Sequence, residues 1–241
     1  MKEPKYQEQY LHHQKNGLSS ALIRELVFGI EDGMVSTLGA VTGIATSTNN
    51  HFFVVLSGSV IIAVESISMA VGSYLSNKSE QAIDDRIIAE EKEEIRKYPV
   101  EEKEEMVDLF VKDGWSKEMA LKMADETAGK PKLMLREMAY RELNLVPDSH
   151  ESPVKKGGIM LFSYILGGFV PLTPYLLLPV EQAIWVSIPV TMSGLFILGV
   201  FTTKYSKRKW WKAGLEMLAL ASTAALIGYA VGQLVDGVWM K

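Results

Sequence analysis

The sequence predicts an all-α integral membrane protein with five transmembrane helices and a long helical insert between helices 2 and 3. Two observations lead to this fold class. Long uncharged runs occupy both ends of the chain, and the charged residues are concentrated between them. Residues 78–156 hold 20 of the 29 Asp and Glu residues and 15 of the 25 Lys and Arg residues. The chain is therefore a hydrophobic body with a hydrophilic insert.

Uncharged runs give the number of spans. Residues 157–180, 182–203 and 217–235 contain no Asp, Glu, Lys or Arg, and each run is close to the roughly 20 residues that cross a bilayer as a helix. A further uncharged run at 33–64 is long enough for two helices, and the turn-forming sequence Ser-Thr-Asn-Asn at 47–50 divides it. We therefore expect spans at 22–46, 52–76, 157–178, 182–203 and 213–237.

Basic residues in the short connections predict the orientation. Five Lys and Arg residues crowd 204–212, whereas the turn at 47–51 and the connection at 179–181 contain none. Because cytosolic loops carry the basic excess, we expect a cytosolic N-terminal segment at 1–21 and transmembrane helices 1 and 2 within 22–77. The next predicted segments along the chain are a cytosolic helical metal-binding domain at 78–156 and transmembrane helices 3 to 5 within 157–241. The first 20 residues lack an apolar core with a cleavage site, so we expect no removable signal.

The insert is predicted to continue the second span without a break, since 79–97 lacks Gly and Pro and is rich in helix formers. Pro99 should end that helix, and shorter helices are expected at 100–113, 116–128 and 132–145. Three pairs of side chains then share helix faces: Glu91 with Glu94, Glu102 with Glu105, and Met138 with Glu142. Their convergence would give an oxygen-rich metal site with one thioether, whereas the simpler reading of such charge is a solvated helix surface.

Two carboxylates fall inside the first two spans. An ionised Asp32 at the bilayer centre would cost about 2.5 to 3.5 kcal/mol, so it needs a compensating role. It lies on a stripe of small and polar residues at helical spacing, which are Gly29, Ser36, Gly39 and Gly43. Glu65 lies one turn from Met69 in the second span. The simpler readings are a hydrogen bond to a neighbouring helix for a carboxylate and ordinary packing for Met69.

A carboxylate beside a thioether favours a borderline transition metal over magnesium or calcium. The chain has no cysteine, so thiolate ligands and disulfides are excluded. Burial raises the pKa of a carboxyl group and a bound cation lowers it, which means that the same groups can hold protons or metal in alternation. The residues therefore predict metal–proton exchange.

Three segments of the chain resemble the vacuolar iron transporter (VIT) family. They are RELVFGIEDGMVSTLG at 24–39, ISMAVGSYL at 67–75 and SYILGGFVPLTPY at 163–175. The resemblance extends nearly end to end. It implies a homodimer with five transmembrane helices per subunit, an ion path at the subunit interface, and a cytosolic metal-binding insert. It also implies that ferrous iron leaves the cytosol in exchange for protons.

Asp32 and Met69 match the family's membrane-embedded ligands. The cytosolic ligands of the family match Glu91, Glu94, Glu102, Glu105, Met138 and Glu142. Two positions depart from the pattern. A family glutamate two turns before the methionine aligns with Ile61, and we infer that Glu65, one turn before Met69, takes its place. The second methionine of an adjacent pair is Ala139.

Alternatives remain open at this stage. Manganese could be the main cargo, with cobalt and zinc as further ions, or the chain could be a membrane-anchored metal buffer or sensor without transport. An enzyme is disfavoured because the sequence has no nucleophile–base arrangement and no Glu-x-x-His. We expect no prosthetic group and no nucleic-acid partner; the partners are the bilayer, divalent metal ions, protons and a second subunit. Compact loops favour a prokaryotic plasma membrane over a vacuolar membrane.

Overall fold

The computed structural model describes residues 19–145, 151–206 and 208–239, and in these residues the chain is helical, with no strand. The chain forms two compact units. The first contains residues up to Tyr74 and from Pro153 onward, and the second is Leu75–Ser152. Most of the predicted N-terminal segment, 1–21, lies outside the described residues, as do 146–150 of the predicted insert.

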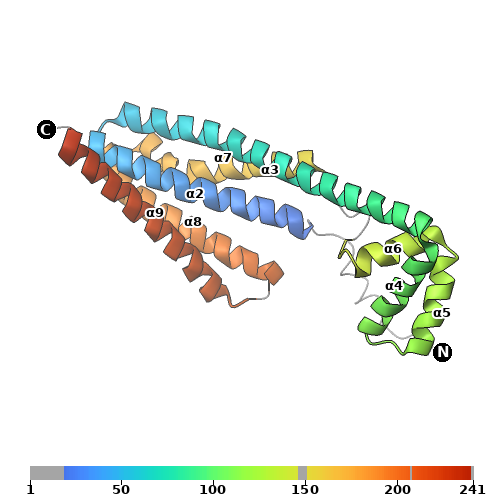
Figure 1. Cartoon of the computed structure of the whole chain (residues 1–241). Helices are drawn as coiled ribbons and strands as arrows, with labels where there is room; N and C mark the ends of the chain where they lie inside the picture. The colour runs from blue at the N-terminus through green and yellow to red at the C-terminus, as the bar shows by residue number, and fades with distance from the viewer. Residues whose placement is uncertain (1–18, 146–150, 207, 240–241) are drawn as a thin grey trace, which may run out of the picture. The chain divides into compact units, whose positions relative to one another are not determined.

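Four helices and the first half of a fifth make the first unit. They are α2 (Ser20–Thr48), α7 (Pro153–Leu177), α8 (Val180–Ser206), α9 (Trp210–Trp239) and the part of α3 up to Tyr74. Figure 1 shows α2 running between α3 and α9. The helices agree with the predicted segments to within a few residues, except that α3 continues beyond 76.

The turn between the first two helices forms where the sequence predicted it. Asn49 ends α2 in the left-handed conformation, with φ of 45°. Its backbone N–H donates to the Ala45 carbonyl. Asparagine tolerates this conformation better than most residues, so the Thr-Asn-Asn sequence reverses the chain within two residues.

A single helix, α3 (His51–Lys97), runs without interruption through the boundary between the units. This confirms the prediction that the second span continues into the insert. Glu65, Met69, Glu91 and Glu94 therefore all lie on one helix. The helix ends at Lys97, and Pro99 begins the next helix because a proline ring is compatible with a first helical turn.

Close contacts between small residues hold the first unit together. A Cβ atom on Gly29 would lie 2.6 Å from the Ser163 Cβ, and one on Gly167 would overlap the Ile30 backbone. A Cβ on Gly232 would lie 2.6 Å from the Gly43 carbonyl oxygen. These glycines let α2 approach α7 and α9 at backbone distance. Gly43 and Gly232 thus serve helix packing within the chain.

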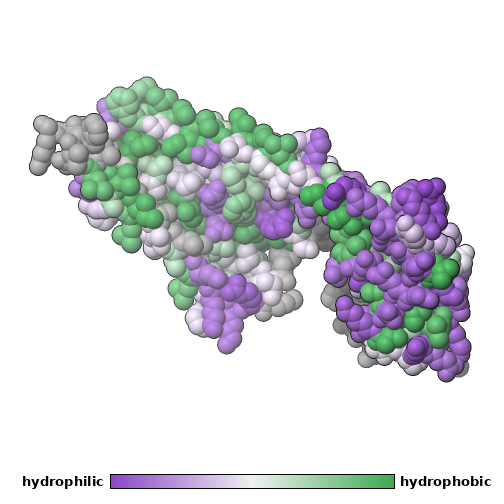
Figure 2. All heavy atoms as spheres, in the orientation of Figure 1, coloured by the Kyte–Doolittle hydropathy of each residue, from purple (hydrophilic) through white to green (hydrophobic). Residues whose placement is uncertain are grey.

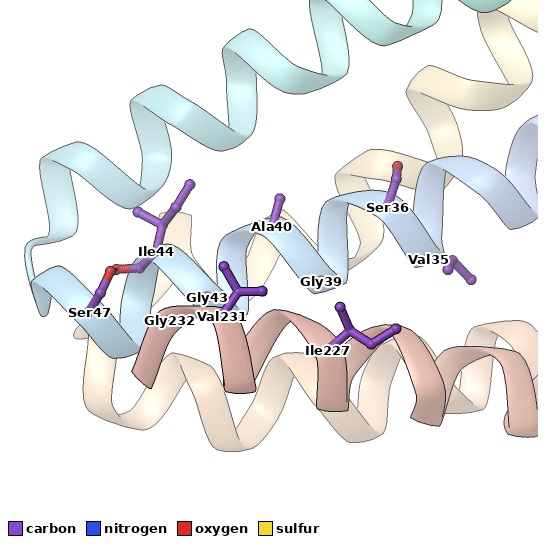
Figure 3. A pocket seen from close by; sticks show the side chains of 10 residues that line it. All are labelled: Val35, Ser36, Gly39, Ala40, Gly43, Ile44, Ser47, Ile227, Val231 and Gly232. Atoms are coloured by element: carbon purple, nitrogen blue, oxygen red, sulfur yellow. The ribbon is translucent and has the colours of Figure 1, made fainter. Parts of the chain in front are cut away.

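The same packing leaves a groove along α2 and α9. Gly39 and Gly43 form its α2 wall, and Ile227 and Val231 project from α9 (Figure 3). Ser36 lies at one end of the groove, and its hydroxyl points away from α9 in this view.

Three short helices follow α3 in the second unit: α4 (Pro99–Lys112), α5 (Lys117–Ala128) and α6 (Pro131–Arg141). Ser116 caps α5 by accepting a hydrogen bond from the Met119 N–H. The prediction that the last helix reaches 145 is wrong. Asn144 is left-handed, with φ of 54°, and the Leu145 N–H turns back to the Ala139 carbonyl, so the helix ends at Arg141.

Three of the described helices, α3, α7 and α8, are long and apolar enough to cross a membrane. Two further helices of the first unit are also long. Helix α2 has 29 residues but carries four charged side chains in its first half, and α9 has 30 residues. The count of five spans stays a prediction. Pro171 and Pro174 lie inside α7 and do not break it. Figure 2 shows hydrophobic surface over much of the first unit and mainly hydrophilic surface on the second.

Candidate functional site

Asp32 is half-buried in the middle of α2. Its neighbours Gly29 and Gly33 press against α7, where a Cβ on Gly33 would overlap the Tyr164 backbone. Residues 29, 32, 33 and 36 lie on one side of α2. The contact of the two glycines with α7 therefore fixes the position of Asp32 along α2 and its orientation relative to α7.

Asp32 on α2 and Glu65 on α3 lie within electrostatic reach of each other. Glu65 is exposed, and Ser66, beside it, is buried on the inner face of α3. Met69 lies half-buried one turn further along α3, and ligation by its sulfur stays a prediction. Ile61, where the family pattern has a glutamate, is half-buried one turn before Glu65.

A contact between two hydroxyl groups lies beside this site, and sequence reasoning missed it. The Ser36 and Tyr164 oxygens are 2.6 Å apart and share a hydrogen bond. Tyr164 is 1% exposed, and its hydroxyl lies within electrostatic reach of both Asp32 and Glu65. Ser36 was placed on the stripe of α2, but no sequence signal links it to a residue 128 positions away.

A second buried carboxylate on α2 was also missed. Glu25 is 5% exposed and accepts a hydrogen bond of 2.8 Å from the Ser73 hydroxyl on α3. The spacing of Glu25 to Gly29 and Asp32 is four and seven residues, so helical periodicity could have added it to the stripe. Its contact with Ser73 ties the first turns of α2 to α3.

Five of the six predicted ligands of the insert converge in the second unit. Glu91 and Glu94 come from α3, Glu102 and Glu105 from α4, and Glu142 stands at the end of α6. We call these five residues the acidic cluster. Glu91 and Glu102 are buried, at 3% and 8% exposure, while the other three are exposed. The cluster therefore combines two buried and three exposed carboxylates.

The carboxylates of the acidic cluster act electrostatically on one another. Burial, followed by repulsion from Glu142, Glu102, Glu94 and Glu105, raises the pKa of Glu91 to about 8. Burial and neighbouring glutamates also raise the pKa of Glu102 and Glu142, and a hydrogen bond to Glu91 opposes the rise at Glu142. Every charged group that acts on these three residues is another carboxylate.

Each of the two buried glutamates has one carboxylate oxygen without a hydrogen-bond partner within the described residues: Glu91 Oε1 and Glu102 Oε2. A buried carboxylate oxygen without a donor is costly, and a divalent cation would satisfy it. Among the described residues, no three Asp, Glu or His side chains are spaced as ligands of one ion, so the cluster is loose here and does not form a closed shell.

Met138 is the sixth predicted ligand of the insert, and it is fully buried in an apolar core. Its neighbours in that core include Met106, Phe110 and Met134. Ala139, where the family has a second methionine, is also fully buried. This packing accounts for Met138 without a metal, so its role as a ligand stays a prediction.

Comparison with known proteins identifies the relatives of this chain. The family model described as the VIT family matches residues 23–233. The chain belongs to the VIT family. The match includes both units and all nine predicted ligand positions, and it confirms the resemblance found in the sequence.

Three relatives illustrate this membership. Vacuolar iron transporter 1 of Arabidopsis thaliana is 26% identical over 97% of this chain and 94% of its own length. The vacuolar iron transporter of Toxoplasma gondii is 28% identical, with 96% and 80% covered. That of Plasmodium falciparum is 26% identical, with 92% and 85% covered. The similarity thus extends over nearly the whole chain.

Proposed function

We propose that this chain is a secondary transporter that exports ferrous iron from the cytosol in exchange for protons. The names of its relatives support transport of a metal ion as the class of function. The observation that carries the proposal is that Asp32 and Glu65, on two different helices of the apolar unit, lie within electrostatic reach of each other. Two ionised carboxylates inside a membrane cost free energy unless a cation compensates their charge. A protein that is only anchored in the membrane has no need of them.

Metal would bind at two places. Asp32, Glu65 and Met69 would hold it in the membrane-embedded unit, and the acidic cluster with Met138 would gather it from the cytosol. The cluster suits this role because its glutamates repel one another and a divalent cation relieves the repulsion. Mixed carboxylate and thioether ligands favour ferrous iron over magnesium or calcium.

Proton exchange follows from the same carboxylates. Protons and metal compete for each group, so a site that faces the acidic side releases metal as it becomes protonated. The alternation of these two states would couple outward movement of metal to inward movement of protons.

The proposal includes five spans and a homodimer with its ion path at the subunit interface. Only 22% of the apolar window of α3 is buried within this chain, which supports further contacts of α3 with lipid or a second subunit. The N-terminus and the insert would lie in the cytosol, in a prokaryotic plasma membrane.

Two alternatives are tested together with this proposal. The same transporter could carry mainly manganese, with cobalt or zinc as lesser cargo. The chain could also be a metal buffer or sensor that binds metal and moves none. An enzymatic activity is not proposed, because the relatives are named as transporters.

The deciding experiment measures metal uptake into liposomes that contain the purified full-length chain. Iron, manganese, cobalt and zinc are compared with and without an imposed pH difference. We expect iron uptake to depend on the pH difference and to be lost in Asp32→Asn. Glu181→Gln is the matched control, since Glu181 is an exposed carboxylate of α8 that contacts Asn49.

The outcomes separate the alternatives. Uptake that ignores the pH difference would remove proton exchange, and faster manganese than iron uptake would change the main cargo. No uptake of any metal, with metal binding retained, would favour the buffer. Wild-type uptake by Asp32→Asn would remove Asp32 from the path.

A further inference from the structure

The Ser36–Tyr164 pair combines features that no other hydroxyl pair of the described residues shares. It joins α2 to α7 through a hydrogen bond of 2.6 Å. Tyr164 is buried, and its hydroxyl is within electrostatic reach of the two carboxylates that the proposed function uses. Ser36 lies one helical turn from Asp32 on the same side of α2.

The direction of the hydroxyl hydrogen matters for metal binding. A serine oxygen that ligates a cation must turn its lone pairs toward the cation, so its hydrogen needs an acceptor elsewhere. The Tyr164 oxygen can accept that hydrogen at the observed distance. The charges of Asp32 and Glu65 act on the same Tyr164 hydroxyl. A buried hydrogen bond of this kind orients both of its members.

We propose that Ser36 is a further oxygen ligand of the membrane metal site and that Tyr164 is the positioning residue that orients it. This inference rests on the proposed function in one respect, since it assumes that Asp32 and Glu65 bind metal. The ligand is a divalent transition-metal ion. A neutral hydroxyl beside two carboxylates adds a hard oxygen donor without adding charge, so it favours manganese and ferrous iron over softer ions.

The competing explanation is that the hydrogen bond only joins two helices. Ser187 supplies the matched control for it. The Ser187 hydroxyl donates to the Pro171 carbonyl at 2.7 Å, is fully buried, and joins α8 to α7. Ser187→Ala therefore removes a comparable interhelical bond, and no carboxylate takes part in it.

The test measures manganese binding to the full-length chain in detergent by electron paramagnetic resonance of the free ion. The parent protein carries Glu91→Gln and Glu102→Gln, which weaken the acidic cluster and leave the membrane site. We expect Ser36→Ala and Tyr164→Phe each to raise the manganese dissociation constant about three- to tenfold, as loss of one oriented hydrogen-bonding group does. Ser36→Thr, which keeps the hydroxyl, should restore binding.

A double-mutant cycle decides whether the two groups act as one. The Ser36→Ala/Tyr164→Phe variant should bind no more weakly than either single variant. Cobalt binding should fall less than manganese binding, and Ser187→Ala should match the parent. Additive losses, unchanged binding in Tyr164→Phe, or no residual manganese site in the parent would each overturn the inference. Binding that behaves as expected without any liposome uptake would instead overturn only the proposed transport.

Discussion

Metal binding to the acidic cluster should release protons, and Glu91 is the main source. Its pKa is raised to about 8 by burial and by the other four glutamates. At pH 7, which is one unit lower, about nine in ten Glu91 side chains hold a proton. A carboxylate must lose its proton to bind a cation, so each metal ion should displace about 0.9 proton from Glu91 alone. The raised pKa values of Glu102 and Glu142 add to this number.

The same competition sets the pH dependence of affinity. Below pH 8 the metal must displace the Glu91 proton, so Glu91 alone should raise the affinity about tenfold per pH unit, or about 1.4 kcal/mol. Above pH 8 that contribution levels off. Glu102 and Glu142 steepen the lower part of the curve, because burial and like charge raise their pKa values as well.

The stability of the metal-free protein should change in the opposite direction. The pKa of Glu91 is higher in the folded chain, about 8, than its ordinary value of 4.5. Its contribution to stability is therefore fully present below pH 4.5 and is lost as the pH rises toward 8, with a limiting slope of about 1.4 kcal/mol per pH unit. Bound metal should reverse this trend, because the cation favours the charged form.

Isothermal titration calorimetry in two buffers of different ionisation enthalpy measures the released protons. The full-length chain carries Asp32→Asn to suppress the membrane site, and manganese is used because it resists oxidation. Glu91→Gln should release about one proton fewer per ion and bind more weakly. Glu126→Gln is the control, since Glu126 is exposed and pairs with Lys130. Equal proton release by Glu91→Gln and its parent would refute a protonated Glu91.

Three further predictions concern single positions. If Glu65 replaces the family carboxylate, Glu65→Gln should abolish metal uptake in liposomes. Adding Ile61→Glu to this variant should restore part of the uptake. Metal uptake unaffected by Glu65→Gln would remove this residue from the path. Met138→Leu keeps the packing, so the melting temperature should change little while the affinity for iron and cobalt falls several-fold. Equal affinity of the variant and the wild type would make Met138 a packing residue only. Gly167→Ala should destabilise the first unit by about 1 to 3 kcal/mol because its Cβ would overlap Ile30. Gly158→Ala is the control, because a Cβ at Gly158 would lie in open space. Equal melting temperatures of the two variants would contradict the close approach of α2 and α7.

Much of the fold could be predicted because bilayer length and turn chemistry leave strong signals. The uncharged runs located α7, α8 and α9, and Asn49 adopts the left-handed turn that the Ser-Thr-Asn-Asn sequence predicts. The absence of Gly and Pro from 79–97 predicted the continuation of α3. The end of α6 was missed, because Asn144 interrupts a sequence that otherwise has helix-forming residues up to Leu145.

Sequence spacing could pair residues on one helix but could not bring helices together. Glu91 with Glu94 and Glu102 with Glu105 were found as separate pairs, and only the fold makes them neighbours of Glu142. The Ser36–Tyr164 contact was inaccessible for the same reason. Whether any of these residues binds metal remains a prediction, since helix packing explains their proximity and not their ligand.

The family departure at Ile61 has a geometric consequence for the proposed site. Moving a carboxylate from position 61 to position 65 shifts it about 6 Å along α3 and rotates it by about 40°, because a helix rises 1.5 Å per residue and turns once in 3.6 residues. Met69 then lies one turn away and not two. Glu65 lies within electrostatic reach of Asp32, so a carboxylate at this position can act together with Asp32. With Met69 only one turn from Glu65, the proposed site would extend less far along α3 than a site spread over two turns.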